Sequence, residues 1–249
     1  MKHNSTGYPT LPLDSERIRA YRARCQKTRE LEEIWSWYVL RRFSIYITLW
    51  LRRTRITPNG VSWLSIVFMI LTGWLMVLAE PWSYLLAVIS YNIGYLCDCI
   101  DGELARLMNV TSRRGFFLDT LIRATSIPIV VSFILALFGW GQSAVVAISL
   151  VYIIIVLSTM ALLVPLAFHL TYSEAEEHDP VGDLRVQSRR AEWLAFFLGL
   201  PGFFAVLPIG VAVEALFAVP FNAVFFTIFL SLFSLKTMAR LYMTYTAIK

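Results

Sequence analysis

Residues 81–106 read PWSYLLAVISYNIGYLCDCIDGELAR, and this stretch decides the fold class. Residues 81–97 are mostly apolar, and this apolar run leads directly into Asp98 and Asp101. A run of this length approaches what a helix needs to cross the hydrocarbon core of a bilayer. In a helix, two residues that are three positions apart share one face. The stretch therefore predicts a membrane-spanning helix that carries carboxylates at one end.

The composition of the whole chain agrees with a membrane location. Of its 249 residues, 57% are hydrophobic and 16% are charged, whereas soluble domains have roughly 45–50% apolar and about 25% charged residues. These values exclude a soluble or a disordered protein. Apolar stretches close to the length of a membrane span occur at Val61–Ala79, Pro81–Cys97, Gly115–Trp140, Ser143–Phe168, Ala191–Val211 and Leu216–Leu235. We therefore predict an all-α integral membrane protein with six transmembrane helices.

The positive charges predict the orientation of these spans. Twelve of the 22 Lys and Arg residues precede residue 60, and all the others except Arg123 lie between spans two and three, between spans four and five, or after span six. The connections near Glu80, Gly141 and Glu214 contain none. By the positive-inside rule, both termini and the carboxylates are cytoplasmic, and we expect a multi-pass protein of a bacterial inner membrane. The formal charge of +5 then reflects orientation, and no nucleic-acid partner is expected.

The chain before the first span divides into two parts. Residues 1–30 form a polar N-terminal tail, and residues 31–56 are rich in Trp, Tyr and Leu but contain Arg41 and Arg42, which make spanning costly. Five apolar residues recur at helical spacing on one face, namely Trp35, Val39, Phe43, Tyr46 and Trp50. We expect an interfacial amphipathic helix with its basic residues toward lipid phosphates, followed by the six-span domain over residues 57–249. A helix packed on a partner protein is the alternative.

A third carboxylate completes a candidate metal site. Asp119 lies four residues after Gly115, where the third span begins, at a depth similar to that of Asp98 and Asp101. Carboxylates at membrane depth are costly, and three of them repel one another unless a cation lies between them. Carboxylate oxygens are the ligands that Mg²⁺ and Mn²⁺ prefer, and Mg²⁺ commonly completes its shell with water and substrate phosphates. The residues alone therefore indicate a divalent-metal site that handles phosphates.

The spacing Asp98-x2-Asp101-Gly102-x2-Ala105-Arg106-x8-Gly115-x3-Asp119 resembles the signature of the CDP-alcohol phosphotransferase family, also called CDP-alcohol phosphatidyltransferases. Upstream, Thr57–Ser62 (TPNGVS) resembles the entry to the first span in that family. The resemblance implies a six-span membrane enzyme of phospholipid synthesis. It would transfer a substituted phosphoryl group from a CDP-linked donor, often CDP-diacylglycerol, to an alcohol acceptor and release CMP.

The resemblance also implies roles for individual residues. Asp98, Asp101 and Asp119 would bind Mg²⁺ or Mn²⁺. The residues implied to contact or make room for the CDP group are Asn59, Ser62, Gly102, Ala105, Arg106, Ser112 and Gly115. Arg113 and Arg114 are candidates to bind the phosphate of a phosphorylated acceptor, or they simply follow the positive-inside rule. The implied partners are a CDP-linked lipid donor, a small alcohol or alcohol phosphate, membrane lipids and a second copy of the chain.

The chain departs from the family pattern at one position. The last Asp of that pattern, the general base, is replaced by Arg123, which cannot accept a proton and is placed to pair with Asp119. A working enzyme then needs another proton acceptor, and Glu103, His169 and Glu174 are nearby candidates that are otherwise read as solvated loop residues. The alternatives are a catalytically impaired homologue that binds a CDP-lipid or a partner, an Arg introduced into the protein, and an ion-coupled transporter.

Overall fold

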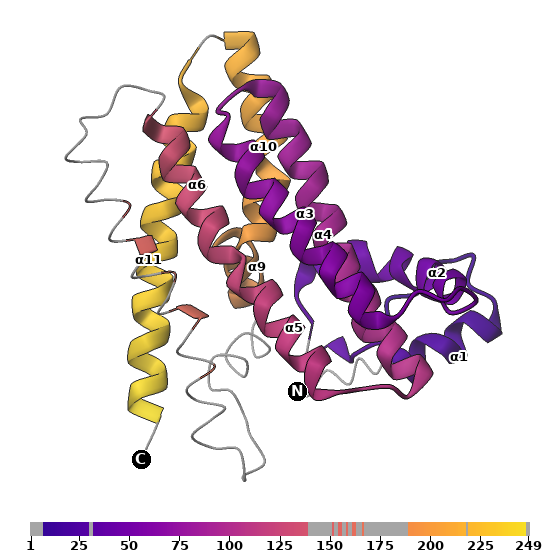
Figure 1. The fold of residues 1–249 in the computed structure, drawn as a ribbon. Coiled ribbons are helices and arrows are strands. Elements are labelled where there is room, and N and C mark those ends of the chain that lie inside the picture. The colour runs from indigo at the N-terminus through magenta and orange to yellow at the C-terminus, as the bar shows by residue number, and fades with distance from the viewer. Residues whose placement is uncertain are drawn as a thin grey trace. The chain divides into compact units, whose positions relative to one another are not determined.

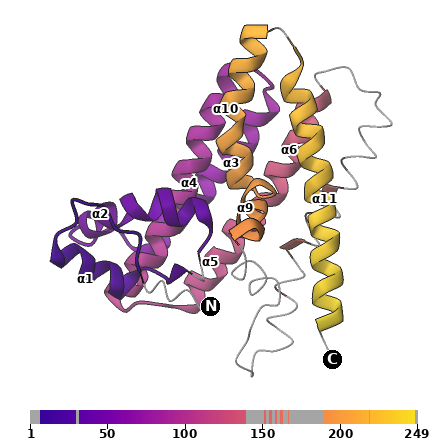
Figure 2. The ribbon, with the colours of Figure 1, turned by 180° about the vertical axis from the view of Figure 1, so that it is seen from behind.

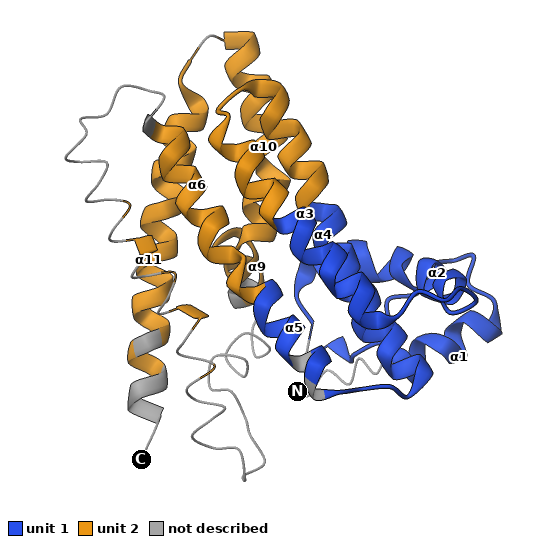
Figure 3. Ribbon diagram, in the orientation of Figure 1, with its two compact units in different colours: residues 1–69, 92–122 blue, residues 70–91, 123–249 orange. Residues whose placement is uncertain are grey.

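The computed structural model describes residues 7–29, 32–138, 189–217 and 219–247, together with a few single positions between 151 and 166. The regular elements of these residues are all helical, which confirms the predicted all-α class. The chain divides into two compact units (Figure 3). Unit 1 contains Met1–Met69 and Asn92–Ile122, and unit 2 contains Ile70–Tyr91 and Arg123–Lys249.

The helices follow one another as Figures 1 and 2 show. In chain order they are α1 (Glu16–Cys25), the short π-helix η2 (Ser36–Leu40), α2 (Arg41–Leu51), α3 (Pro58–Val77), α4 (Pro81–Met108), α5 (Arg113–Ala124), α6 (Ser126–Phe138), α9 (Arg189–Phe197), α10 (Leu200–Phe217) and α11 (Phe221–Ala247).

Among the described residues, five segments are long and apolar enough to cross a membrane. They are Pro58–Val77, Pro81–Met108, Phe117–Leu137, Leu200–Phe217 and Phe221–Arg240. These segments support the integral membrane class and correspond to five of the six predicted spans. The predicted fourth span, Ser143–Phe168, falls almost wholly outside the described residues, so the total of six stays a prediction.

Proline and glycine explain where the helices differ from the predicted spans. The third predicted span is divided between α5 and α6 because Pro128 lacks an amide N–H and its ring crowds the carbonyl of Ala124, the last residue of α5. The fifth was predicted at residues 191–211, but the helix of spanning length there begins only at Leu200. Gly199 separates it from α9, and Pro201 is tolerated in the first turn of α10.

Phenylalanine rings form the core of unit 2. Phe133 of α6 stacks on Phe203 of α10, with 4.1 Å between ring centroids. It also meets Phe226 and Phe229 of α11 at 5.8 and 5.9 Å. α10 and α11 lie side by side in both views (Figures 1 and 2). This core makes unit 2 a packed helical scaffold.

The chain before α3 packs as a layer in unit 1. We call residues 14–51, from Asp14 through α1, η2 and α2, the N-terminal layer. Residues 1–30 are predicted to be a polar tail, but α1 forms there with Ser15 as its N-cap, and its Arg22 is 0% exposed. Arg22 is buried because its guanidinium pairs with Asp14 at 2.8 Å and donates to the carbonyls of Arg41 and Arg42 at 2.7 and 3.0 Å. The tail prediction missed this helix.

Within the predicted interfacial helix at residues 31–56, the structure has η2 and α2, which cover residues 36–51, and its location in the interface stays a prediction. Its predicted apolar face is unpartnered within the described residues at the α2 end, where Phe43 is 56% and Trp50 is 63% exposed. Arg41, however, is only 4% exposed and does not reach outward toward lipid phosphates as predicted. It points into unit 1 because two carboxylates, Glu32 and Glu103, bind it there at 2.7 and 3.0 Å.

Candidate active site

The start of α3 and the end of α4 are held in register where the acidic motif lies. Ser65 Oγ donates to the carbonyl of Gly94 at 2.8 Å, and a Cβ at Gly94 would lie 3.3 Å from the Ser65 carbonyl. Only a glycine permits so close an approach of the two helices without displacement. The two helices run in opposite directions from this contact, so Ser62 lies against α4 further along, where its hydroxyl donates to Asp101. The motif Asp101 is thereby fixed against the first predicted span.

The third predicted metal ligand, Asp119, lies on α5. Asp119 acts electrostatically on Asp101, and the two negative charges oppose each other. Asp98 lies on the same helix as Asp101 and is also half-buried. Two half-buried carboxylates that repel each other are a donor set that fits a hard divalent cation. In the described part of the chain, no three His, Cys, Asp or Glu side chains lie close enough to form a closed metal site, so the complete ligand set stays a prediction.

Several of the predicted nucleotide-contacting residues come together at the N-termini of α3 and α5. Ser112 is placed as the N-cap of α5, because its Oγ accepts from the Gly115 amide at 3.1 Å. A Cβ at Gly115 would lie 3.6 Å from Ser112 Oγ and 3.9 Å from Asn59 Oδ1. Asn59, Ser112 and Gly115 are therefore neighbours, and their contact with a CDP group stays a prediction. Ser62, one turn after Asn59 on α3, contacts Asp101 instead.

Gly102, Ala105 and Arg106 follow Asp101 on α4. Arg106 turns its Nε to the carbonyl of Cys25, and a Cβ at Gly102 would lie 3.3 Å from both Nη atoms of Arg106. Arg106 Nη2 is buried without a hydrogen-bond partner among the described residues. This group has the chemistry to donate to a phosphate oxygen, and the predicted contact of Arg106 with the CDP group stays a prediction. Ala105 is half-buried beside it.

The remaining predicted residues are placed less fully. Arg114 is exposed at the start of α5, and the side chain of Arg113 lies outside the described part of the structure. Arg123 lies one turn after Asp119 on α5 with an exposed side chain. The predicted pairing of these two residues stays a prediction. His169 and Glu174 are outside the described residues.

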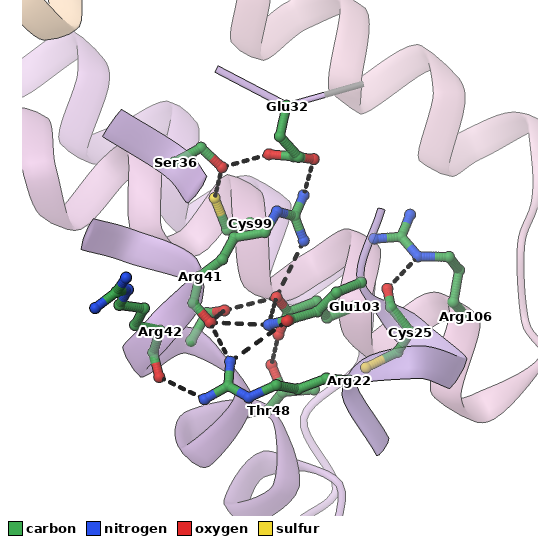
Figure 4. Close-up of polar contacts among 12 residues, drawn as sticks. Arg22, Cys25, Glu32, Ser36, Arg41, Arg42, Thr48, Cys99, Glu103 and Arg106 are labelled. Carbon is green, nitrogen blue, oxygen red and sulfur yellow. Dashed lines mark hydrogen bonds and ion pairs between the residues drawn. The ribbon is translucent and has the colours of Figure 1, made fainter. Parts of the chain in front are cut away.

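Glu103 was interpreted as a solvated loop residue, and this interpretation is wrong. It lies inside α4, and it is 0% exposed. Oε1 accepts from Gln26 Nε2 at 2.9 Å, Arg41 Nη1 at 3.0 Å and Ser44 Oγ at 2.6 Å, and Oε2 accepts from Thr48 Oγ1 at 2.9 Å (Figure 4). Because both oxygens are engaged by buried donors, Glu103 is not placed to serve as the missing proton acceptor.

Glu103 and its partners form a buried polar cluster that was not predicted from the sequence. We call it the Glu103 cluster and define it as Gln26, Glu32, Arg41, Ser44, Thr48 and Glu103. A signal was present, because Ser44 and Thr48 are four residues apart and share with Arg41 the helix face opposite the aromatic one. A polar face opposite an apolar one also suits a helix that lies on lipid, so this stripe did not by itself indicate a buried carboxylate partner. The identity of its partner could not be read from that stripe.

The charges of the N-terminal layer affect its titrating groups. Burial opposes ionisation of Asp14, but hydrogen bonds from Arg22, Tyr46 and the Leu11 amide outweigh it and lower the pKa of this carboxyl. Burial, followed by the negative charge of Glu103, raises the pKa of the Cys25 thiol to about 12. Cys25 is therefore a neutral buried group at physiological pH.

A separate small cavity lies in unit 2, at the ends of α3 and α10 and the starts of α4 and α11. Its volume is about 230 Å³, and its polar lining residues are Tyr84, Glu214 and Asn222. Glu214 accepts from the Asn222 amide at 3.1 Å and so caps the first turn of α11. None of the predicted site residues lines this cavity, so we place the candidate active site in unit 1.

Comparison with known proteins identifies the family. No curated protein matches the chain. The family profile described as CDP-alcohol phosphatidyltransferase matches residues 55–248, which include α3 to α11 and every predicted site residue. Enzymes of this kind transfer a phosphoryl-containing group from a CDP-alcohol to an alcohol in lipid synthesis, and they generally use divalent metal ions. Together with the five apolar helices and the motif on α4 and α5, this match shows that the chain belongs to the CDP-alcohol phosphatidyltransferase family of membrane transferases.

Proposed function

We propose that this protein transfers a substituted phosphoryl group from CDP-diacylglycerol to a small alcohol or alcohol phosphate and releases CMP on the cytoplasmic side of a bacterial inner membrane. The observation that carries the proposal is the position of Asp101, which contacts Ser62 of α3 and faces the charge of Asp119 on α5. The motif therefore lies where the ends of three helices in unit 1 meet.

The donor set supports the metal part of the proposal. Asp98, Asp101 and Asp119 would hold Mg²⁺ or Mn²⁺, since carboxylate oxygens are the ligands that these cations prefer. When bound, such a cation neutralises the diphosphate and stabilises the phosphoryl group during its transfer. The repulsion between Asp101 and Asp119 gives the site a reason to take up a cation.

The chain's own residues then have distinct tasks. Asn59, Ser112 and Gly115 border the CDP group, with Gly115 leaving room, and Arg106 Nη2 supplies a donor to a phosphate oxygen. Arg113 and Arg114 bind the phosphate of a phosphorylated acceptor. In the reaction, the acceptor oxygen forms a bond to the phosphorus that carries the lipid. The bond from this phosphorus to the CMP oxygen breaks with its electron pair remaining on CMP, and the acceptor proton passes to solvent water.

Arg123 supports a second candidate, a homologue that binds the CDP-lipid but turns over slowly. A guanidinium cannot accept the acceptor proton, and Glu103 is fully engaged by donors. The two candidates differ in the effect of Arg123→Asp, which restores a carboxylate one turn after Asp119. In the impaired homologue this change raises turnover.

The test is CMP release from CDP-diacylglycerol by the full-length protein, with Mg²⁺ and Mn²⁺ varied over a panel of alcohols and alcohol phosphates. We expect metal-dependent release that Asp98→Asn and Asp101→Asn abolish, whereas Glu16→Gln, at an exposed carboxylate of α1, leaves it unchanged. Metal-dependent CDP binding without release, together with a gain from Arg123→Asp, identifies the impaired homologue. No release and no CDP binding in any condition overturns both.

The N-terminal helix adds a proposal on location. We propose that α2 lies in the membrane interface, because Phe43 and Trp50 are exposed apolar residues on the face opposite the Glu103 cluster. The fluorescence of Trp50 is obtained as the difference between the wild-type protein and Trp50→Phe. Brominated lipids should quench this fluorescence if α2 lies in the interface. Absence of quenching would favour a protein partner for this face.

A further inference from the structure

Glu103 lies two residues after Asp101 on the same helix. At about 100° per residue, two positions correspond to a rotation of about 200° around the helix. The motif carboxylate and the buried carboxylate therefore lie on nearly opposite faces of α4. One face carries Asp101 toward Ser62, and the other carries Glu103 toward the N-terminal layer.

Within the described residues, the four donors to Glu103 all come from that layer. They belong to Gln26, Arg41, Ser44 and Thr48, which lie 55 to 77 positions away in the sequence. Arg41 also binds Glu32 at 2.7 Å through its second terminal nitrogen, and its own carbonyl accepts from Gln26 at 2.9 Å (Figure 4). The N-terminal layer therefore binds α4 at Glu103 through several hydrogen bonds and ion pairs that share the same side chains, so a shift of one partner affects the others.

A second attachment lies one turn further along the helix. Arg106, three residues after Glu103, donates from Nε to the carbonyl of Cys25 (Figure 4). Residues that are three apart share a face. Two bonds on one face, separated by a turn, determine the rotation of α4 about its axis, and that rotation determines where Asp98 and Asp101 point.

Stability alone is a weak reason for such a cluster. Replacement of a buried ion pair by apolar residues of similar volume is often neutral or stabilising. A buried polar network gives directional contacts that apolar packing does not. Asp101, a proposed metal ligand two residues before Glu103, would need such directional control of its helix.

We propose that Glu103 is a positioning residue, which sets the orientation of the α4 motif through the N-terminal layer. The inference rests on the proposed function, because it assigns to Asp101 a role in the metal site. The layer lies before residues 55–248, so these donors stand outside the family-matched segment. Part of the active-site geometry is thus supplied by residues 26–48.

The test compares two buried carboxylates in the full-length protein. Glu103→Gln removes the charge that faces α2. Asp14→Asn is the matched control, since the hydrogen bonds of the buried Asp14 join it to Leu11, Arg22 and Tyr46 and, among the described residues, not to α4. Mn²⁺ binding without substrate is measured by electron paramagnetic resonance, alongside kcat and KM for CMP release and the melting temperature. Thr48→Val, which removes a single donor to Glu103, is a milder variant in case Glu103→Gln does not fold.

Residues that orient metal ligands typically contribute about 10-fold to 100-fold to metal affinity or activity. We therefore expect Glu103→Gln to weaken Mn²⁺ binding and lower kcat by about this factor, and Thr48→Val to do so by a few-fold. Asp14→Asn should lower the melting temperature while Mn²⁺ affinity stays at the wild-type value. Unchanged Mn²⁺ affinity in both Glu103→Gln and Thr48→Val overturns the inference, as does an equal loss in Asp14→Asn.

The two proposals fail in different ways. If the wild-type protein binds Mn²⁺ but releases no CMP, the proposed turnover is wrong, and the Mn²⁺ affinities of the variants still decide the role of Glu103. If the wild-type protein is active and Glu103→Gln binds Mn²⁺ and turns over normally, the inference is wrong and the proposed function stands. A wild-type protein that binds no Mn²⁺ overturns the inference, because there is then no metal site to position.

Discussion

The N-terminal layer of unit 1 and the phenylalanine core of unit 2 are both buried, but different forces hold them together. In the layer, Arg41 lies between Glu32 and Glu103, and each charge has a specific partner at hydrogen-bond distance. In the core, Phe133 and Phe203 stack 4.1 Å apart, with no polar atom to orient them. Polar contacts depend steeply on geometry, whereas apolar contacts are non-directional.

This difference relates to what each region must do. Apolar cores tolerate exchanges of similar volume, so they suit a scaffold that only has to keep helices together. A network of buried charges fails when one member is removed, so it suits a place where the orientation of a helix matters. The predicted site residues of unit 1 lie beside the network, and the aromatic core contains none of them.

The largest effect is expected from Arg41→Met. This change leaves Glu32 and Glu103 buried without their shared cation, and breaking a buried ion pair in this way typically costs about 3–5 kcal/mol. Chemical denaturation in detergent, followed by tryptophan fluorescence, measures the free energy of unfolding. Arg24→Met, at an exposed position of α1, should change it by less than about 0.5 kcal/mol. Equal losses in both variants would mean that burial of the pair contributes nothing.

A pH titration should sharpen the comparison. The pKa of Cys25 is raised from 9.0 to about 12 in the folded protein, so unfolding at alkaline pH releases a proton. The stabilisation is therefore fully present below pH 9 and is lost as the pH rises toward 12, by up to about 1.4 kcal/mol for each pH unit. Unit 2 has no cysteine, because the three in the chain are Cys25, Cys97 and Cys99.

The measurement is the difference in unfolding free energy between the wild-type protein and Cys25→Ala across this pH range. Other groups that titrate in both proteins cancel in the difference. A difference that does not change with pH would show that Cys25 ionises equally readily in the folded and unfolded chains.

The smallest effect is expected from a conservative substitution in the aromatic core. Phe133→Leu keeps an apolar side chain of related volume at a fully buried site, so the cost should stay below about 1.5 kcal/mol. Phe133→Ala, which leaves a cavity, should cost about 3–5 kcal/mol in the same assay. A loss from Phe133→Leu as large as that from Arg41→Met would contradict the contrast between the two regions.

Local patterns were enough to predict much of the fold and part of the site. Asp98 and Asp101 share a face because of helical spacing alone. The interruptions at Thr125 and Gly199 were missed, although Pro128 and Pro201 provided the signal. In both cases the prediction of one continuous helix followed the length of the apolar run and gave too little weight to the backbone constraint that proline imposes.

The sequence alone determined the membrane class, the helical character and the acidic motif, because apolar length and helical periodicity depend only on neighbouring residues. The tertiary structure decided that Arg41 points inward, that Glu103 is its buried partner, and that Ser62 meets Asp101. These pairs join residues 39 to 62 positions apart. Every Arg in the N-terminal part was an equally plausible partner for Glu103 from the sequence, and only the packing of the helices brings one of them within hydrogen-bond distance.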